Sequence, residues 1–213
     1  IDSLVNKTKA PAKNILLSMQ AEYVQAYKNN NRFRLYNRTA LENETGADIH
    51  TWSLKKLNTE IEKLYNASLQ NTELLKNTPI TDFDDILDKG KTTVGFRPTL
   101  YDFLVHRALD YFMNTESDVS APNFSFLIDD ENAFANATTF VQTHFKTKDS
   151  NSLLYHALIL FQDILRFHLQ DKNTDALIDA DIARINFVYN NTIIAKKDIL
   201  FESALQKMEH VYA

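Results

Sequence analysis

The scarcity of glycine and proline is the feature that most constrains how this chain can fold. Only three glycines and four prolines occur among its 213 residues. Antiparallel sheets and α/β folds need tight turns repeatedly, and many of those turns require a glycine or a proline at a set position. Long helices with few connections need far fewer such residues. The sequence therefore predicts an all-α fold.

Charge and composition exclude several classes of protein. The net charge of −5 gives no electrostatic reason to expect a nucleic-acid partner, since nucleic-acid-binding domains usually concentrate positive charge. The absence of cysteine excludes disulfides, thiolate metal sites and thiol nucleophiles. The best apolar run, 157–161, ends at Gln162 and is far shorter than the roughly 20 residues that a membrane-spanning helix needs. We therefore expect no membrane span in this segment. We also expect it to fold, because a hydrophobic fraction of 44% is enough to form a core.

The first strong helical pattern lies near the N-terminus. Ile15, Met19, Tyr23 and Tyr27 are spaced four residues apart and predict one apolar stripe along a helix. The polar stretch 31–50 that follows has little periodicity. A loop of this length is unusual inside a compact domain, so the stretch is either functional, mobile or an element that the pattern does not reveal.

Two further predicted helices, Tyr101–Phe112 and Leu153–Leu169, are apolar nearly all round, so we expect them to form the core. The final helices are joined by short connections, which favours antiparallel hairpins. The expected architecture is an irregular antiparallel bundle or a short stack of helical hairpins. Stacking of the tetratricopeptide type is compatible with the pattern, but no repeat consensus is present. The remaining helices are predicted at 52–69, 132–145, 174–189 and from 198 onward.

Length predicts one all-helical domain over residues 1–213, with a division into 1–95 and 96–213 as the alternative. The chain begins at Ile1 rather than at a methionine, so we expect it to be a fragment of a larger protein.

Two motif-like patterns lack residues that their chemistry needs, and a third pattern is a run of acidic residues. Gly90-Lys91-Thr92 resembles the tail of a phosphate-binding loop, but Asp85 stands where that loop has its first glycine. Residues 171–175 have the Asp-x-Asn-x-Asp spacing of a calcium loop, but Ile182 stands where the bidentate glutamate belongs. The aspartates of 82–88 form a run of like charges, which favours a solvated surface. We therefore expect no metal site in these segments.

Histidine gives only weak candidates for chemistry. His156 and His168 are twelve residues apart and have no evident third metal ligand. The alternative of a helical enzyme predicts a cavity where the polar groups of Asp102, His106 and Arg107 converge. A buried and fully packed His106 would argue against that alternative. We expect no catalytic residue, no cofactor and no metal, and we predict that the chain is not an enzyme.

One cluster combines basic and aromatic residues, in the segment 32–38. Arg32, Arg34 and Arg38 alternate with Phe33, Leu35 and Tyr36. The arginines are candidate contacts for a partner or an anion. The competing interpretation, which we favour on sequence alone, is that they cap the carbonyls at the end of the preceding helix and pack their stems on the aromatic rings.

Several stretches taken in order resemble one known family. The most specific is Leu100–Leu109, which reads Leu-Tyr-Asp-Phe-Leu-x-His-Arg-Ala-Leu. The others are 21–27, 31–39, 48–57, 79–83 and 175–181. Together they resemble the N-terminal helical region of the very large alpha-2-macroglobulin-like proteins of Bacteroidetes, from about Ala12 to near the C-terminus.

The resemblance implies a role in the cell envelope. Such proteins look like envelope-associated protease traps, in which a bait region is cut and the molecule closes on the attacking protease. The implied location is periplasmic or outer-membrane-associated. The implied partners are other domains of the same chain and, through the full-length protein, proteases. The oligomeric state is not indicated.

The resemblance carries no functional residue onto this chain. Members that react covalently use a Cys-x-x-Gln-type thioester, which a segment without cysteine cannot contain. The expected function is that of a non-catalytic structural or interaction segment of an alpha-2-macroglobulin-like protein. The alternative is a free-standing helical adaptor that binds a protein or peptide partner.

Overall fold

A computed structural model describes residues 2–36, 46, 48–87, 93–114, 125–149 and 151–212. Within these ranges the regular structure is helical, and extended backbone pairs only in two isolated bridges. The predicted all-α fold is confirmed. The chain forms two compact units, unit 1 (1–79 and 99–108) and unit 2 (80–98 and 109–213).

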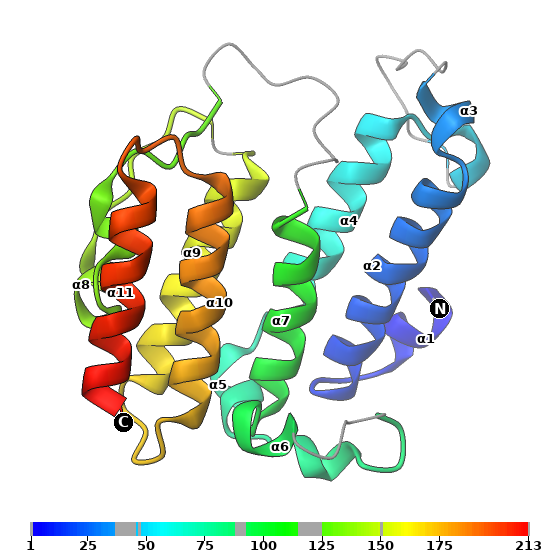
Figure 1. The fold of residues 1–213 in the computed structure, drawn as a ribbon. Helices are drawn as coiled ribbons and strands as arrows, with labels where there is room; N and C mark the ends of the chain where they lie inside the picture. The colour runs from blue at the N-terminus through cyan, green and yellow to red at the C-terminus, as the bar shows by residue number, and fades with distance from the viewer. Residues whose placement is uncertain are drawn as a thin grey trace. The chain divides into compact units, whose positions relative to one another are not determined.

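The helices of unit 1 come mostly from the N-terminal third of the chain (Figure 1). They are α1 (Asp2–Lys7), α2 (Ala12–Asn30), α3 (Arg32–Tyr36), the 3-10 helix η1 (Ile49–Thr51), α4 (Leu54–Ser68), α5 (Thr72–Lys76) and the first part of α7 (Leu100–Phe112). Unit 2 contains the 3-10 helix η2 (Ile80–Phe83), α6 (Thr93–Phe96), the end of α7, the 3-10 helix η4 (Glu131–Phe134), α8 (Ala137–Gln142), α9 (Leu153–His168), α10 (Asp175–Asn191) and α11 (Lys197–Tyr212).

Unit 1 is built on the packing of α2 against α4, which lie side by side in Figure 1. Ser53 begins α4, because its Oγ accepts a hydrogen bond from the backbone N–H of Lys56. The far end of α4 is held by Asn14 of α2, whose Nδ2 donates to the carbonyls of Ser68 and Gln70, each at 2.8 Å. The buried amide therefore satisfies carbonyls that the helix end leaves without an internal donor.

The apolar stripe of α2 is buried only in part. Ile15 is buried, whereas Met19 is 38% exposed and Tyr23 is 60% exposed. The face of α2 that is buried carries smaller residues instead, among them Ser18 and Ala21. Large residues on one face and small ones on the other mean that hydrophobicity alone does not identify the packed face of this helix.

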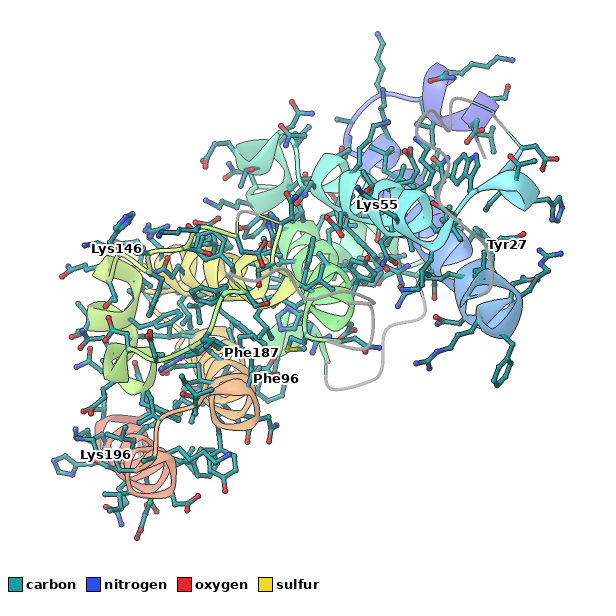
Figure 2. The ribbon with its side chains drawn as sticks, turned by 90° about the horizontal axis from the view of Figure 1, so that it is seen from above. Tyr27, Lys55, Phe96, Lys146, Phe187 and Lys196 are labelled. Carbon is teal, nitrogen blue, oxygen red and sulfur yellow. The ribbon has the colours of Figure 1, made fainter. Side chains whose placement is uncertain are left out.

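Unit 2 is organised around α9, which Figure 1 shows beside α10, with α11 following. Ser152 begins α9 by accepting a hydrogen bond from the backbone N–H of Tyr155. The rings of Phe161 in α9 and Phe187 in α10 lie 5.5 Å apart, and Figure 2 labels Phe187 in this core. The prediction that this helix lies in the core is confirmed.

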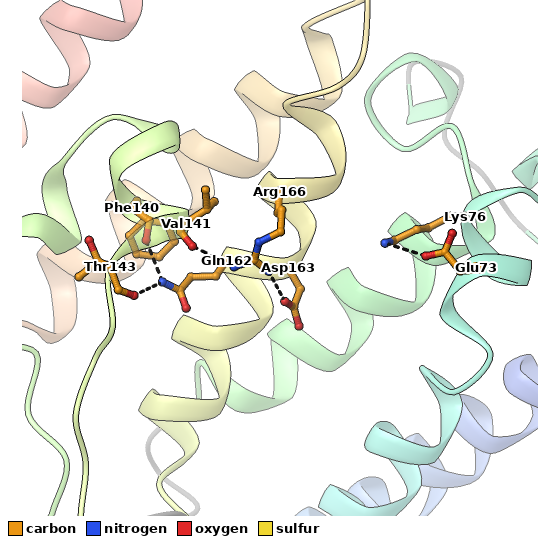
Figure 3. Close-up of polar contacts among 8 residues, drawn as sticks. All are labelled: Glu73, Lys76, Phe140, Val141, Thr143, Gln162, Asp163 and Arg166. Carbon is orange, nitrogen blue, oxygen red and sulfur yellow. Dashed lines mark hydrogen bonds and ion pairs between the residues drawn. The ribbon is translucent and has the colours of Figure 1, made fainter.

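Gln162 joins α9 to α8. Its Nε2 donates to the carbonyls of Phe140 at 2.8 Å and Thr143 at 2.7 Å (Figure 3). Arg166 adds a bond from Nη2 to the carbonyl of Val141 at 2.9 Å. The amide of Gln162 and the guanidinium of Arg166 thus supply donors to carbonyls at the end of a short helix.

One local prediction is wrong. The helix predicted at 132–145 is interrupted, because Asn136 has extended backbone and its side chain accepts from the N–H of Thr139 to begin a new helix. The helix predicted at 174–189 is present as α10, and Thr174 makes no side-chain cap at its start. Asn173 takes that role instead, accepting from the N–H of Asp175 at 2.9 Å.

Candidate functional site

Asp102, His106 and Arg107 do not converge on a shared site. Both Thr99 donors, the backbone N–H and the hydroxyl, reach Asp102 Oδ2 at 2.9 Å, so this carboxylate caps the start of α7. His106 is buried, with Nδ1 2.9 Å from the carbonyl of Asp102. Arg107 points elsewhere, toward Ser18 and Glu22 at 2.8 and 2.7 Å. The contacts of Asp102 and His106 are therefore local to α7, whereas Arg107 joins α7 to α2.

The calcium-like segment forms a turn between helices. Asp171 lies 2.7 Å from His168 Nδ1, and Asn173 caps α10, so their side chains are directed to different partners. Within the described ranges no group of three or more histidine or acidic side chains could hold a metal ion. Asp82, Asp84 and Asp85 are exposed, as a solvated surface requires. Gly90, Lys91, Thr92 and Asp88 lie outside the described residues.

The basic and aromatic segment meets the end of α2 through Arg34 and Tyr27. We call the exposed and half-buried residues of these two elements the aromatic–basic surface (Tyr23, Tyr27, Arg32, Phe33 and Arg34). Arg34 Nη2 donates to Tyr27 Oη at 2.7 Å. Phe33 is 89% exposed, while Leu35 anchors α3 with 1% exposure.

His50 extends the polar part of this surface. Its Nδ1 lies 3.2 Å from Tyr27 Oη, and the two rings meet edge to face at 5.5 Å. Figure 2 labels Tyr27 on α2. The carbonyl of Tyr27 receives the backbone and side-chain N–H groups of Asn31. Arg34 therefore binds a phenol, whereas the interpretation favoured on sequence had it capping carbonyls; Arg38 lies outside the described residues.

Unit 2 contains a cavity of about 210 Å³. Its walls come from η4, the start of α8, α10 and α11. We call it the Asp181 cavity, and its lining residues are Phe134, Ala135, Asn136, Ala137, Asp181, Arg184, Ile185, Ala204, Lys207, Met208, His210, Val211 and Tyr212. Lys207, His210 and Val211 are exposed, so the cavity opens to solvent along α11.

A buried ion pair forms the polar floor of the cavity. The Arg184 side chain is 0% exposed and that of Asp181 is 6% exposed. Arg184 Nε and Nη2 both donate to Asp181 Oδ1, at 2.9 and 2.5 Å. Arg184 also donates to the carbonyls of Ala133 and Ala135, and its guanidinium lies 4.7 Å from the centre of the Phe140 ring.

Burial changes the acidity of this pair and of a neighbouring phenol. Loss of water raises the pKa of Asp181, although the charge of Arg184 opposes the shift. The same burial lowers the pKa of Arg184, with Asp181 opposing. The pKa of Tyr212 is raised, first by burial and then by the negative charge of Asp181. The field of the carboxylate therefore reaches a residue that lines the cavity.

The chain matches no family model, no curated protein and no solved structure. Over the parts of the chain that the structure describes, no helix has the length and hydrophobicity to span a bilayer.

Sequence reasoning did not select Asp181 or Arg184 as site residues, although a signal was present. Both follow the same helical spacing as the buried Leu177, Ile185 and Val188. Opposite charges three residues apart on an otherwise apolar helix face indicate a buried pair, because unpaired charges are rarely buried there.

Proposed function

We propose that this chain is a non-catalytic binding segment that docks a protein partner through the aromatic–basic surface. The observation that carries the proposal is Phe33, whose side chain is 89% exposed between two arginines. Large exposed aromatic rings are costly to leave in water, and aromatic and arginine side chains contribute much of the binding energy at protein interfaces. Tyr23 adds a second exposed ring on α2.

The charge of this part of the sequence indicates the chemistry of the partner. No acidic residue occurs between Glu22 and Glu42, whereas Lys28, Arg32, Arg34 and Arg38 fall within that interval. This local excess contrasts with the net charge of −5 for the whole chain. Complementary charge favours an acidic segment that also presents an apolar group to Phe33.

The finer proposal is that the partner is another domain of the same protein, an alpha-2-macroglobulin-like chain of the cell envelope. It rests on the stretches of sequence that resemble that family, above all Leu100–Leu109. A helical segment in front of a protease trap has no reaction to perform, so a docking surface is a role that fits it. The second candidate, a free-standing adaptor for a protein or peptide, is favoured by the cavity of unit 2.

Hydrogen–deuterium exchange on the full-length gene product tests the docking surface. We compare the natural protein with Phe33→Ser. If the surface is occupied by another domain, the variant should increase exchange within an acidic segment outside this chain, since that segment loses its contact. An Arg32→Glu/Arg34→Glu variant should likewise increase exchange within the same acidic segment.

The matched control is Ile86→Ser, which alters another exposed hydrophobic residue outside the surface. It should leave the exchange of the acidic segment unchanged. If Phe33→Ser changes exchange only within 23–36, the surface does not dock a domain of the same protein, and the proposal is wrong.

A further inference from the structure

The Asp181 cavity combines apolar walls with one carboxylate oxygen that accepts no hydrogen bond from the part of the chain that the structure describes. Asp181 is 4% exposed and lines the cavity. Its Oδ1 accepts both bonds from Arg184, and none of the described residues donates to Oδ2. Because no described protein donor takes up this oxygen, it is open to a donor from a ligand in the cavity.

We propose that this cavity binds a small neutral aromatic molecule that carries a single N–H or O–H donor, of the indole or phenol class. The ring contacts the apolar walls, and the donor bonds to Asp181 Oδ2. Where a water molecule serves that oxygen in the empty protein, the ligand replaces both the water and its hydrogen bond.

The volume sets the size of the ligand. A cavity of about 150 Å³ with aliphatic and aromatic walls takes up benzene. The cavity of unit 2, at about 210 Å³, has room for a somewhat larger ring with a polar atom. It is smaller than the roughly 300–1,000 Å³ of sites for drug-sized ligands, which excludes nucleotide or flavin cofactors.

The charges around the cavity select a neutral ligand. Asp181 and Arg184 balance each other, and the other ionisable residues of the lining that can be cationic are Lys207 and His210. An ammonium group would add a positive charge beside Arg184. A carboxylate or phosphate would meet the negative oxygen of Asp181 at the floor. A neutral donor satisfies that oxygen without adding charge.

The apolar walls of the cavity come from three elements. Phe134 belongs to η4, Ile185 to α10, and Ala204 and Met208 to α11. The methionine is adaptable and contacts aromatic rings favourably. The small side chain of Ala204 leaves the space that the ring would occupy.

A matched pair of ligands tests the donor. Indole and indene have nearly the same shape, but indene has no N–H. We measure the affinity of the chain for each by calorimetric titration, and follow the backbone amides of the lining residues by NMR. Indole should bind at least about tenfold more tightly than indene, since hydrogen bonds to charged groups are the stronger ones. Equal affinities, no binding, or shifts confined to other residues would overturn the proposal.

A matched pair of variants tests the location. Ala204→Leu fills the cavity and should abolish indole binding. Glu202→Leu changes an exposed residue of the same helix outside the cavity and should leave binding unchanged. The ligand comparison on the natural chain stands even if the filled variant does not fold. Tighter binding of N-acetyl-tryptophanamide than of indole would show that the cavity accepts a partner's side chain, and would overturn the assignment to a small molecule.

Discussion

Arg184 has no exposed surface, so protein groups alone must balance its charge. Asp181, two backbone carbonyls and the face of Phe140 surround its guanidinium. Taking both ions out of water costs several kcal/mol, and their attraction returns most of it. Such a pair contributes little net stability. Removing one member of the pair lowers the free energy of unfolding strongly, because the other member is left buried with an unbalanced charge.

Arg184→Met should lower the free energy of unfolding by roughly 3–5 kcal/mol. The reason is that the variant leaves the Asp181 carboxylate buried without its cation. Urea denaturation followed by circular dichroism measures the change. The double variant Asp181→Leu/Arg184→Met should be less destabilised than the single one, because no charge remains buried.

A second pair in unit 2 serves as control. Asp163 and Arg166 have the same spacing in α9 and lie 2.8 Å apart, but their side chains are about half exposed (Figure 3). Asp163→Asn breaks this exposed pair but keeps the bond from Arg166 to the Val141 carbonyl, and it should cost only about 0–1 kcal/mol, as exposed pairs do. A loss equal to that of Arg184→Met would show that burial does not determine the effect of Arg184.

At the scale of the element, the sequence predicts helices well where apolar residues are both periodic and buried. The helix at 153–169 was predicted because nearly every face is apolar, and the structure confirms it. The break at Asn136 was missed because its cap depends on one side chain in an otherwise helical pattern. In α2 the packed face carries Ser18 and Ala21, and small or polar side chains give no hydrophobic signal of their burial. The Asp181 cavity was missed for a related reason, since it depends on how η4, α10 and α11 meet.

Asn14→Ala should destabilise the packing of α2 against α4 by roughly 1–3 kcal/mol, because it removes two hydrogen bonds to the end of α4. Thermal and urea unfolding measure the loss. Asn29→Ala, on an exposed position of the same helix, should change stability by less than about 0.5 kcal/mol. If the two variants melt alike, the amide of Asn14 does not hold the two helices together.

At the scale of the whole molecule, the stretch that most resembles the macroglobulin-like family has a structural explanation. Leu100, Leu104, Val105 and Leu109 are fully or almost fully buried in α7. Asp102 caps the same helix. These residues are therefore needed to build and pack a helix, and they indicate no chemistry. Function in such a segment would come from surfaces and cavities, which is where both proposals lie.

The proposed membership in that family makes a prediction about the length of the native protein. Helical packing alone does not need a longer chain, whereas a segment in front of a protease trap does. Such a protein contains many β-sandwich domains of about 100 residues each, so we expect the native gene product to exceed a thousand residues. Sequencing the native coding region and measuring the mass of the intact protein check this. A Cys-x-x-Gln downstream would add covalent trapping of the protease. A stop codon shortly after Ala213 would contradict the family proposal and leave the adaptor, whose ligand the indole and indene titrations would then address first.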